Sequence, residues 1–393
     1  MERPTAAHRI VRGTSRLVRL ALAAGLAAAL LAGCATPHTR GPRVSGQDKD
    51  REAAIQRRLY VKEILSMNTR LHNVGYTVAR AGEPLCPAKA PGFGMVVEST
   101  PSFPEDLREA FDEVMKPGDR PVVVGLLPGG PADRAGVRVG DRIVSVDKES
   151  AGEDDADLQE ALFTAATQAL RERRRTLRFQ LQRGALPVTA EIEPEVVCGY
   201  FFRLELGEAP NAYSTGPSIT VSQGMMRLAD TDEYLAVVLG HEMAHSAYGH
   251  LEAQKENSAV GGILDVLSAL AGGQTHGAFS AAAGNAFSTD FEREADYAGL
   301  YFTARAGYPV DHAADFWRRM SLRNMGTISR DTDHPSNAER YELVERTAAE
   351  IDAKIAAGEP LVPNMDEKTG DAAGSGRAEG AAAPDRGVVR GSE

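Results

Sequence analysis

The sequence predicts an α+β protein in which a β-rich domain is followed by a mostly helical domain. Residues 88–193 contain short β-rich runs separated by turn residues, a pattern typical of a small β domain. Residues 199–358 contain three segments with helical spacing of apolar residues and recognisable ends. The chain has 393 residues, which is enough for two domains with separate hydrophobic cores.

Residues 1–33 have the composition of a secretion signal. An apolar run of 14 residues, LALAAGLAAALLAG, follows five arginines at positions 3, 9, 12, 16 and 19. A helix needs about 20 apolar residues to cross a bilayer, so a cleaved signal peptide is the better interpretation. The run ends in LAGC, residues 31–34, and this sequence resembles the lipobox of bacterial lipoproteins.

The lipobox resemblance implies cleavage before Cys34 and acylation of its thiol and of its new amino group. Two or more acyl chains hold a protein stably at a membrane, whereas one does not. Because Ala35 rather than an aspartate follows Cys34, the outer membrane, with the protein facing the periplasm, is the expected destination. The alternative is an ordinary cleaved signal in which Cys34 is not modified.

The charge distribution indicates that the protein does not bind nucleic acid. The formal net charge is −11, and the signal itself carries more positive than negative charge. Elsewhere the only basic cluster is RERRR at 171–175, which we interpret as a solvated helix end. A nucleic-acid-binding surface needs a basic patch or stripe.

The N-terminal part of the mature chain is predicted to be a tether and then a helix. Residues 34–50 are polar and contain two prolines, which suits a flexible linker. Helical spacing then runs from Asp50 to about Ala81, with apolar residues at positions 55, 59, 64 and 71 near one face. We assign residues 51–85 to a helix that packs on the second domain.

The β-rich region, residues 88–193, contains a specific turn sequence. In VVGLLPGGPADRAGVRVGDRIVSV a strand leads to PGGPADRAG, then to GD and a further strand, and this order resembles bacterial PDZ domains. Pro131 can begin the short helix that Gly136 ends. The resemblance implies that GFGMVV, residues 92–97, is the loop that takes a peptide's terminal carboxylate beside an open strand edge.

Two cysteines remain after the signal, Cys86 and Cys198. An exported protein meets an oxidising compartment, where an even pair favours a disulfide. The pair brackets the β-rich domain, and such a bond would close a long loop. Two buried free thiols are the alternative.

The second domain, residues 199–358, has three clear helices. One begins near Thr231 and runs to about Leu251, one begins near Ser288 and stops at Gly307, and the last spans NAERYELVERTAAEIDAKIAA before Gly358. Residues 254–288 are rich in glycine and alanine, and the sequence does not decide between a loop, a groove wall and a membrane-touching element. The tail, residues 359–393, has no aromatic residue, and we expect disorder there.

The stretch VVLGHEMAHSAYGH contains three of the nine histidines. His241 and His245 are four residues apart, so both imidazoles leave one helix face and can bind one ion. Glu242 lies between them and can reach water at such an ion. The surrounding helix is strongly apolar, and a bound metal compensates for burying these polar groups there.

A catalytic zinc needs a third protein ligand and one open position. The candidates lie in FEREADYAG, where Glu292 and Asp296 are also four residues apart. One of them can bind the metal while the other forms a hydrogen bond with a ligand histidine. An acidic first helix turn that only complements the helix dipole is the alternative.

HEMAH followed by EREAD resembles the HtpX-type and CAAX-prenyl-protease-type zinc metallopeptidases, which are gluzincins with a mostly helical zincin-type domain. The resemblance implies one Zn²⁺ per chain held by His241, His245 and Glu292, with Glu242 as the catalytic acid and base. It also implies that Asp296 supports a ligand, that residues 211–226 form a substrate-binding edge strand, and that His334 and Arg340 act at the site. We interpret His250 as structural, because five positions past His245 it faces elsewhere on the helix.

The implied activity is zinc-dependent endoproteolysis of misfolded or misassembled envelope proteins, with a substrate's C-terminus held by the PDZ-like domain. Arg340 and His334 are expected to stabilise the oxyanion. His334 has a second possible role, capping the metal in a resting state. Two rivals remain open: a PDZ-based envelope scaffold, and a chaperone-like lipoprotein, in either case with a structural metal.

Overall fold

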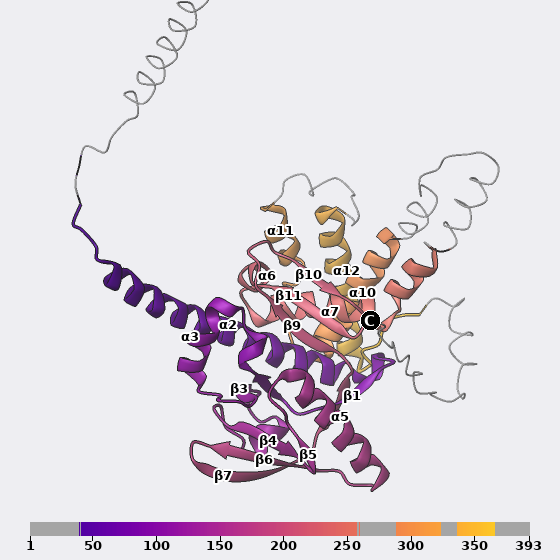
Figure 1. The fold of residues 1–393 in the computed structure, drawn as a ribbon. Helices are drawn as coiled ribbons and strands as arrows, with labels where there is room; N and C mark the ends of the chain where they lie inside the picture. Colours follow the sequence, from indigo (N-terminus) through magenta and orange to yellow (C-terminus); the bar gives the residue numbers. More distant parts are fainter. Residues whose placement is uncertain (1–38, 40, 258, 260–287, 324–335, 366–393) are drawn as a thin grey trace, which may run out of the picture. The chain divides into compact units, whose positions relative to one another are not determined.

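The computed structural model describes residue 39 and residues 41–257, 259, 288–323 and 336–365 (Figure 1). The signal peptide, Cys34, most of the glycine- and alanine-rich stretch at 254–288, His334 and residues 366–393 lie outside this description. The chain divides into two compact units, Met1–Ala54 and Ile55–Glu393. In the first unit, the described residues end with the start of helix α2, where Arg51 pairs with Asp48 at 2.8 Å.

Helix α2, Gly46–Ala81, begins earlier than the predicted Asp50 and takes up the end of the predicted tether. Its buried face is formed by residues three or four positions apart, Val61, Ile64, Leu65, Asn68, Leu71, Val74 and Val78. Ile55 and Leu59 were expected on this face, but they are 37% and 59% exposed. The apolar face therefore begins at Val61.

The α2 helix belongs to two hydrophobic clusters. Val61, Ile64 and Leu65 pack with residues of the β-rich domain such as Phe111. Leu71, Val74 and Val78 pack into the core of the second domain. The prediction that this helix packs on the second domain thus covers only its C-terminal half.

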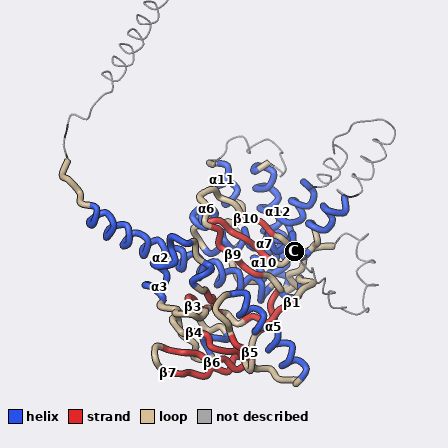
Figure 2. The backbone as a smooth tube through the Cα atoms, viewed as in Figure 1, coloured by secondary structure: helices blue, strands red, loops and turns tan. Residues whose placement is uncertain are grey.

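The β-rich domain is built on an antiparallel sheet in the order β2-β3-β4-β6-β7, with β5 paired to β4. Its strands are β2 (Met95–Glu98), β3 (Val122–Leu126), β4 (Arg142–Val146), β5 (Glu149–Ser150), β6 (Leu177–Arg183) and β7 (Leu186–Ile192). Its helices are α3 (Glu105–Met115), α4 (Pro131–Arg134) and α5 (Asp155–Arg171). Figure 2 shows β4, β6 and β7 lying together.

The turn sequence behaves as predicted at most positions. Pro131 begins α4, and Gly129 and Gly136 have φ angles of 71° and 80°. Either glycine of the PGG turn could have supplied a positive φ angle, but only Gly129 does so, because Gly130 has φ −71°. Two further strands, β1 (Lys89–Gly92) and β8 (Glu195–Cys198), pair antiparallel beside the predicted disulfide, which the structure forms between Cys86 and Cys198.

The second domain combines helices with a three-stranded sheet in the order β10-β11-β9. The strands are β9 (Phe201–Glu205), β10 (Ala212–Ser214) and β11 (Ser218–Ser222), and β11 runs parallel to β9. The helices are α6 (Gln223–Leu228), α7 (Asp232–Ala247), α10 (Ser288–Arg305), α11 (Asp315–Ser321) and α12 (Asn337–Ala357). With the antiparallel sheet, these elements confirm the predicted α+β class.

Residues 359–365, predicted to be disordered, form an ordered strap on the second domain. The backbone N–H of Asn364 donates to the Tyr297 hydroxyl at 2.9 Å, and Lys354 donates to the carbonyl of Val362 at 2.7 Å. Arg305 donates to the carbonyls of Leu361 and of Ala81 at the end of α2. Hydrogen bonds of its own backbone groups and of the Asn364 side chain hold this segment, which contains no aromatic residue of its own.

Within the described residues, we find no helix that combines the length and the apolar composition needed to span a bilayer.

Candidate metal centre

Helix α7 is positioned by its cap and by its apolar sequence. The Thr231 hydroxyl accepts a hydrogen bond from the backbone N–H of Tyr234, which satisfies one free donor of the first turn. Residues 235–244 are buried along the whole width of the helix. His241, Glu242 and His245 are therefore carried into the interior by a helix that apolar packing already fixes.

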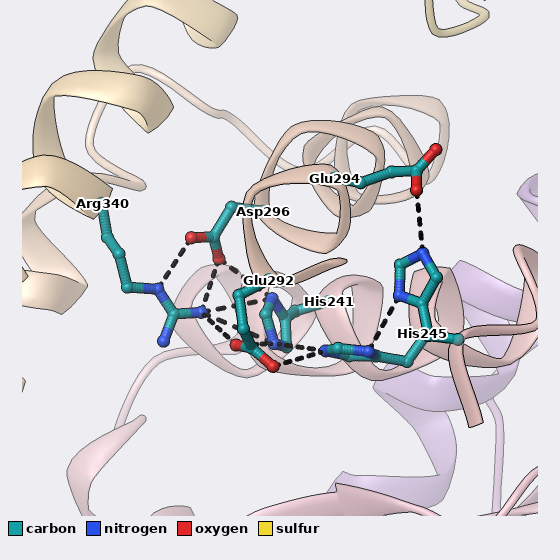
Figure 3. A network of polar contacts seen from close by, with 7 residues as sticks. His241, His245, Glu292, Glu294, Asp296 and Arg340 are labelled. Atoms are coloured by element: carbon teal, nitrogen blue, oxygen red, sulfur yellow. Dashed lines mark hydrogen bonds and ion pairs between the residues drawn. The ribbon is translucent and has the colours of Figure 1, made fainter. Parts of the chain in front are cut away.

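A close crossing brings α10 to the histidine face of α7. A Cβ atom at Gly240 would lie 2.3 Å from the carbonyl oxygen of Gly299, so only glycine allows the observed approach. The Thr303 hydroxyl contacts the carbonyl oxygen of Ala236 across the interface at 3.1 Å. This crossing places Glu292 and Asp296 of α10 beside the two imidazoles, as Figure 3 shows.

Three side chains converge on one point. His241, His245 and Glu292 each offer a ligand atom, and these atoms lie within 4.8 Å of one another. The two Nε2 atoms are 3.1 Å apart, and Glu292 oxygens lie 3.5 Å from Nε2 of His241 and 3.2 Å from Nε2 of His245. Two imidazole nitrogens and one carboxylate are a donor set that fits a zinc ion with an open position.

The charges of the centre also fit a divalent cation. Glu242, Glu292 and Asp296 are at most 8% exposed, and Arg340, at 7%, is the buried basic side chain beside them. Three carboxylates and one guanidinium leave an excess of negative charge in a buried place. Such an excess is costly without a compensating cation.

Asp296 lies behind the first ligand. Its carboxylate is 2.9 Å from Nδ1 of His241 and accepts two hydrogen bonds from Arg340, at 2.7 and 2.6 Å. Because Nδ1 faces a carboxylate, it carries the proton, and the Nε2 lone pair is left for the metal. The guanidinium of Arg340 stacks 3.5 Å above the Trp317 ring, which fixes the far side of this group.

The two imidazoles have opposite pKa shifts. Burial acts to lower the pKa of His241, but hydrogen bonds with Asp296 and Glu292 outweigh it and raise the pKa to about 10. Burial lowers the pKa of His245 to about 4. The pKa of Asp296 is lowered, because Arg340 and His241 outweigh its burial. Because the pKa of His241 is raised, this imidazole has to release a proton from Nε2 when it binds a metal.

His250 differs from the prediction. It is 4% exposed, and its Nδ1 lies 3.0 Å from Nδ1 of His245 instead of facing away. The physical reason is that α7 ends at Ala247, before the predicted Leu251, and Gly249 has a φ angle of 70°. The chain turns there, so the helical spacing used for His250 does not apply.

An edge strand lies next to α7, as expected for residues 211–226. Among the described strands β10 pairs only with β11, and the Ser214 hydroxyl forms a hydrogen bond with that of Ser246 on α7. Within the part of the chain that the structure describes, the other backbone edge of β10 has no strand partner, and an extended chain could pair there.

The structure gathers most of the predicted site residues and adds others. His241, Glu242, His245, Glu292, Asp296 and Arg340 meet at the contact of α7, α10 and α12, whereas His334 lies outside the described residues. Trp317 and Glu294 also lie at the site and were not among the predicted residues. The even spacing of Glu292, Glu294 and Asp296 in EREAD was the available signal for Glu294.

Comparison with known proteins agrees with this geometry. Residues 199–348 match the model of peptidase family M48, and residues 122–172 match a model of the PDZ domain. Mitochondrial metalloendopeptidase OMA1 of Schizosaccharomyces pombe is 30% identical over 153 residues, 37% of this chain and 45% of that protein. Metalloprotease LoiP of Escherichia coli is 28% identical over 153 residues, 36% of this chain and 60% of that protein.

Both aligned segments therefore span less than two thirds of these relatives. A crystal structure of the HtrA3 PDZ domain bound to a phage-derived ligand (FGRWV) is 25% identical and covers 28% of this chain and 88% of that chain, with a TM-score of 0.21. The family resemblance drawn from HEMAH and EREAD is confirmed by the matched segment, which contains all the converging side chains. Residues 199–348 form a peptidase family M48 domain, in a chain that also contains a PDZ domain.

Proposed function

We propose that this chain is a zinc-dependent endopeptidase of the bacterial cell envelope that cleaves misfolded or misassembled envelope proteins. The observation that carries the proposal is the convergence of His241, His245 and Glu292 from two helices, with Glu242 on the same helix as the histidines. A purely structural metal does not need an acid such as Glu242 beside it.

The side chains have separate roles in peptide hydrolysis. His241, His245 and Glu292 would hold the ion, which when bound supplies Lewis-acid chemistry toward water and the scissile carbonyl. Glu242 takes a proton from the attacking water and delivers it to the leaving nitrogen. Asp296 holds the His241 ring in the tautomer that offers Nε2, and Arg340 holds Asp296.

Oxyanion stabilisation by Arg340 and by His334 stays a prediction. Nε and Nη2 of Arg340 already donate hydrogen bonds to Asp296. A hydrogen bond from Arg340 to the oxyanion would therefore come from Nη1. Extended substrate is proposed to pair with the open edge of β10, which would align the peptide beside α7.

The PDZ domain is proposed to hold the C-terminus of a polypeptide. This is supported by β2, which is an edge strand of its sheet, and by the loop before it, where Gly94 has a φ angle of 65°. A peptide with a free C-terminal carboxylate should bind, and its amidated form should not. Equal binding of the two forms would contradict carboxylate recognition.

Attachment to the envelope is proposed to occur through acylated Cys34, with the outer membrane as the destination. The support is the LAGC sequence at the end of an apolar run behind five arginines. Labelled palmitate should enter the wild type and not the Cys34→Ser variant. Equal labelling of the two proteins would rule out this anchor.

Metal analysis and digestion of casein test the peptidase together. Wild type should bind about one zinc per chain and cleave casein until a chelator is added. Glu242→Gln should keep the zinc and lose the cleavage, whereas Glu292→Gln should lose both. Glu233→Gln, on the first turn of the same helix, is the control and should match wild type. Undiminished cleavage by Glu242→Gln would overturn the mechanism.

The same variants separate the rival functions. A scaffold or chaperone-like lipoprotein with a structural metal should retain its function in cells when Glu242 is replaced by Gln. A peptidase should lose it. Full complementation by Glu242→Gln would therefore favour the rivals.

A further inference from the structure

The second ligand histidine has a hydrogen-bond partner of its own. Nδ1 of His250 lies 3.0 Å from Nδ1 of His245, and Nε2 of His250 lies 3.0 Å from a carboxylate oxygen of Glu294 (Figure 3). Glu294 stands on α10 between Glu292 and Asp296. A continuous path of polar contacts therefore leads from Nδ1 of His245, the nitrogen that faces away from the metal site, through His250 to the carboxylate of Glu294 on α10.

Only one arrangement of protons lets His245 act as a ligand. Metal binding uses the Nε2 lone pair of a neutral imidazole, so the ring proton of His245 must be on Nδ1. That N–H then donates to Nδ1 of His250, which has to be unprotonated. His250 keeps its proton on Nε2 and donates it to Glu294, an acceptor that carries no proton when ionised.

The surroundings hold His250 in this orientation. Its ring stacks on Phe291, with centroids 4.8 Å apart and an angle of 18° between the planes. The His250 side chain is 4% exposed, whereas Glu294 is about half exposed and keeps contact with water. The fixed ring of His250 keeps its Nδ1 directed at His245, and the solvated carboxylate of Glu294 accepts the proton on Nε2 of His250. Together they favour the His245 tautomer that has its proton on Nδ1.

The two ligand histidines are thus supported in two different ways. Nδ1 of His241 meets the carboxylate of Asp296 directly, and Arg340 neutralises that carboxylate. Nδ1 of His245 reaches Glu294 through an additional imidazole, which separates this carboxylate from the metal centre. The second arrangement orients the ligand without adding another buried negative charge beside the metal.

We infer that His250 and Glu294 are positioning residues that orient His245 and fix its proton on Nδ1 for metal binding. This inference rests on the proposed function, because it requires that His245 is a metal ligand. Partners of ligand histidines typically contribute 10- to 100-fold to metal affinity. We expect an effect of that size from His250 and a smaller one from Glu294.

Zinc affinity, measured by competition with a chromogenic chelator, tests the inference without proteolysis. His250→Phe keeps an aromatic ring against Phe291 but removes the acceptor, and it should weaken zinc binding about 10- to 100-fold. His250→Asn places an amide oxygen near the position of Nδ1 and should recover most of the loss. Glu294→Gln should weaken binding by less than about tenfold.

A matched control and a spectroscopic measurement exclude a merely structural effect. His72→Phe replaces a partly buried imidazole on α2, which donates to the carbonyl of Asn68 far from the metal ligands in the sequence, and zinc affinity should be unchanged. In zinc-loaded Glu242→Gln protein, ring ¹⁵N spectra should show the proton of His250 on Nε2. Thermal unfolding of the metal-free variants reports whether they fold.

The possible outcomes separate this inference from the proposed function. Wild type that binds no zinc would overturn the proposed function and this inference with it. Zinc-binding wild type together with unchanged affinity in His250→Phe, or a proton on Nδ1 of His250, would overturn this inference alone. Equal losses in His250→Asn and His250→Phe would also contradict it, because the acceptor would then be irrelevant.

Discussion

At the scale of single residues, the ion pair between Arg340 and Asp296 decides how the candidate centre is held. Both side chains are buried, at 7% and 4% exposure, and two hydrogen bonds join them. A buried pair contributes little compared with apolar packing, but the loss of one partner leaves a charge without compensation. The stability of the domain is therefore sensitive to Arg340 in particular.

We expect Arg340→Met to lower the free energy of unfolding of the metal-free protein by about 3–5 kcal/mol. Methionine retains much of the side-chain volume, so the decrease in unfolding free energy comes mainly from the Asp296 carboxylate that has lost its guanidinium partner. Urea denaturation measures this decrease. The control is Arg293→Met, because Arg293 pairs with Glu339 and Asp290 at 40% exposure and should cost less than about 1 kcal/mol. Equal costs for the two variants would contradict this view of Arg340.

At the scale of elements, the crossing of α7 and α10 determines the distance between the histidines and the carboxylates. The approach depends on two glycines that face each other, Gly240 and Gly299. No rotation of a side chain can relieve a clash there, because the atom nearest to a Cβ at either glycine is a backbone atom of the other helix. The metal centre and the helix packing are therefore coupled through this contact.

Gly240→Ala should separate the helices and weaken zinc binding as well as stability. Its Cβ would meet the carbonyl oxygen of Gly299 at 2.3 Å, so α10 must shift and carry Glu292 away from His241. We expect at least a tenfold loss of zinc affinity by chelator competition, following the size of effects at ligand supports. Gly46→Ala, where a Cβ meets nothing within 4 Å, is the control and should leave zinc affinity unchanged. Normal affinity in Gly240→Ala would show that the crossing can relax.

The sequence predicted the elements that carry local signals. Thr231 and Gly358 mark helix ends by their own chemistry, and the spacing of HEMAH and EREAD places four side chains on two helix faces. The contact of His250 with His245 was missed because it follows from Gly249, whose positive φ ends regular helical spacing. The strap at 359–365 was missed because backbone groups hold it, and composition does not report them.

At the scale of the whole molecule, the disulfide closes the region that contains the PDZ domain. Cys86 and Cys198 are 112 residues apart in the sequence, and both are buried. The bond stands beside the pairing of β1 with β8, so it ties the two chain ends of this region together. A link across so long a loop removes many conformations from the unfolded chain.

Reduction of the disulfide should therefore lower the free energy of unfolding by roughly 4–5 kcal/mol. Comparison of chemical denaturation with and without reductant measures the difference on a single sequence. A Cys86→Ala/Cys198→Ala variant is the control, and reductant should not affect it. If reduction leaves wild type equally stable, the loop is already constrained in the unfolded chain.

Besides the disulfide, the carboxylate of Glu195 connects distant parts of the chain, because it binds side chains of α2 and of the turn in the PDZ domain. It accepts hydrogen bonds from Tyr76 at 2.9 Å and Arg80 at 3.3 Å, both on α2, and from Arg134 of α4 at 3.1 Å. Burial acts to raise the pKa of Glu195, but these three donors outweigh it and lower the pKa. The ionised form is thus favoured in the folded protein.

A lowered carboxylate pKa fixes the sign of a pH effect. The stabilisation is present above the pKa of an unfolded glutamate, about 4.3, and is lost as the pH falls through the lower pKa of the folded state. Wild type should therefore exceed Glu195→Gln in unfolding free energy near neutral pH, and the difference should shrink on acidification below about pH 4. Glu193→Gln makes the same charge change at an exposed position and should show a smaller difference. A gap between wild type and Glu195→Gln that stays constant with pH would mean that packing, rather than charge, links the two elements.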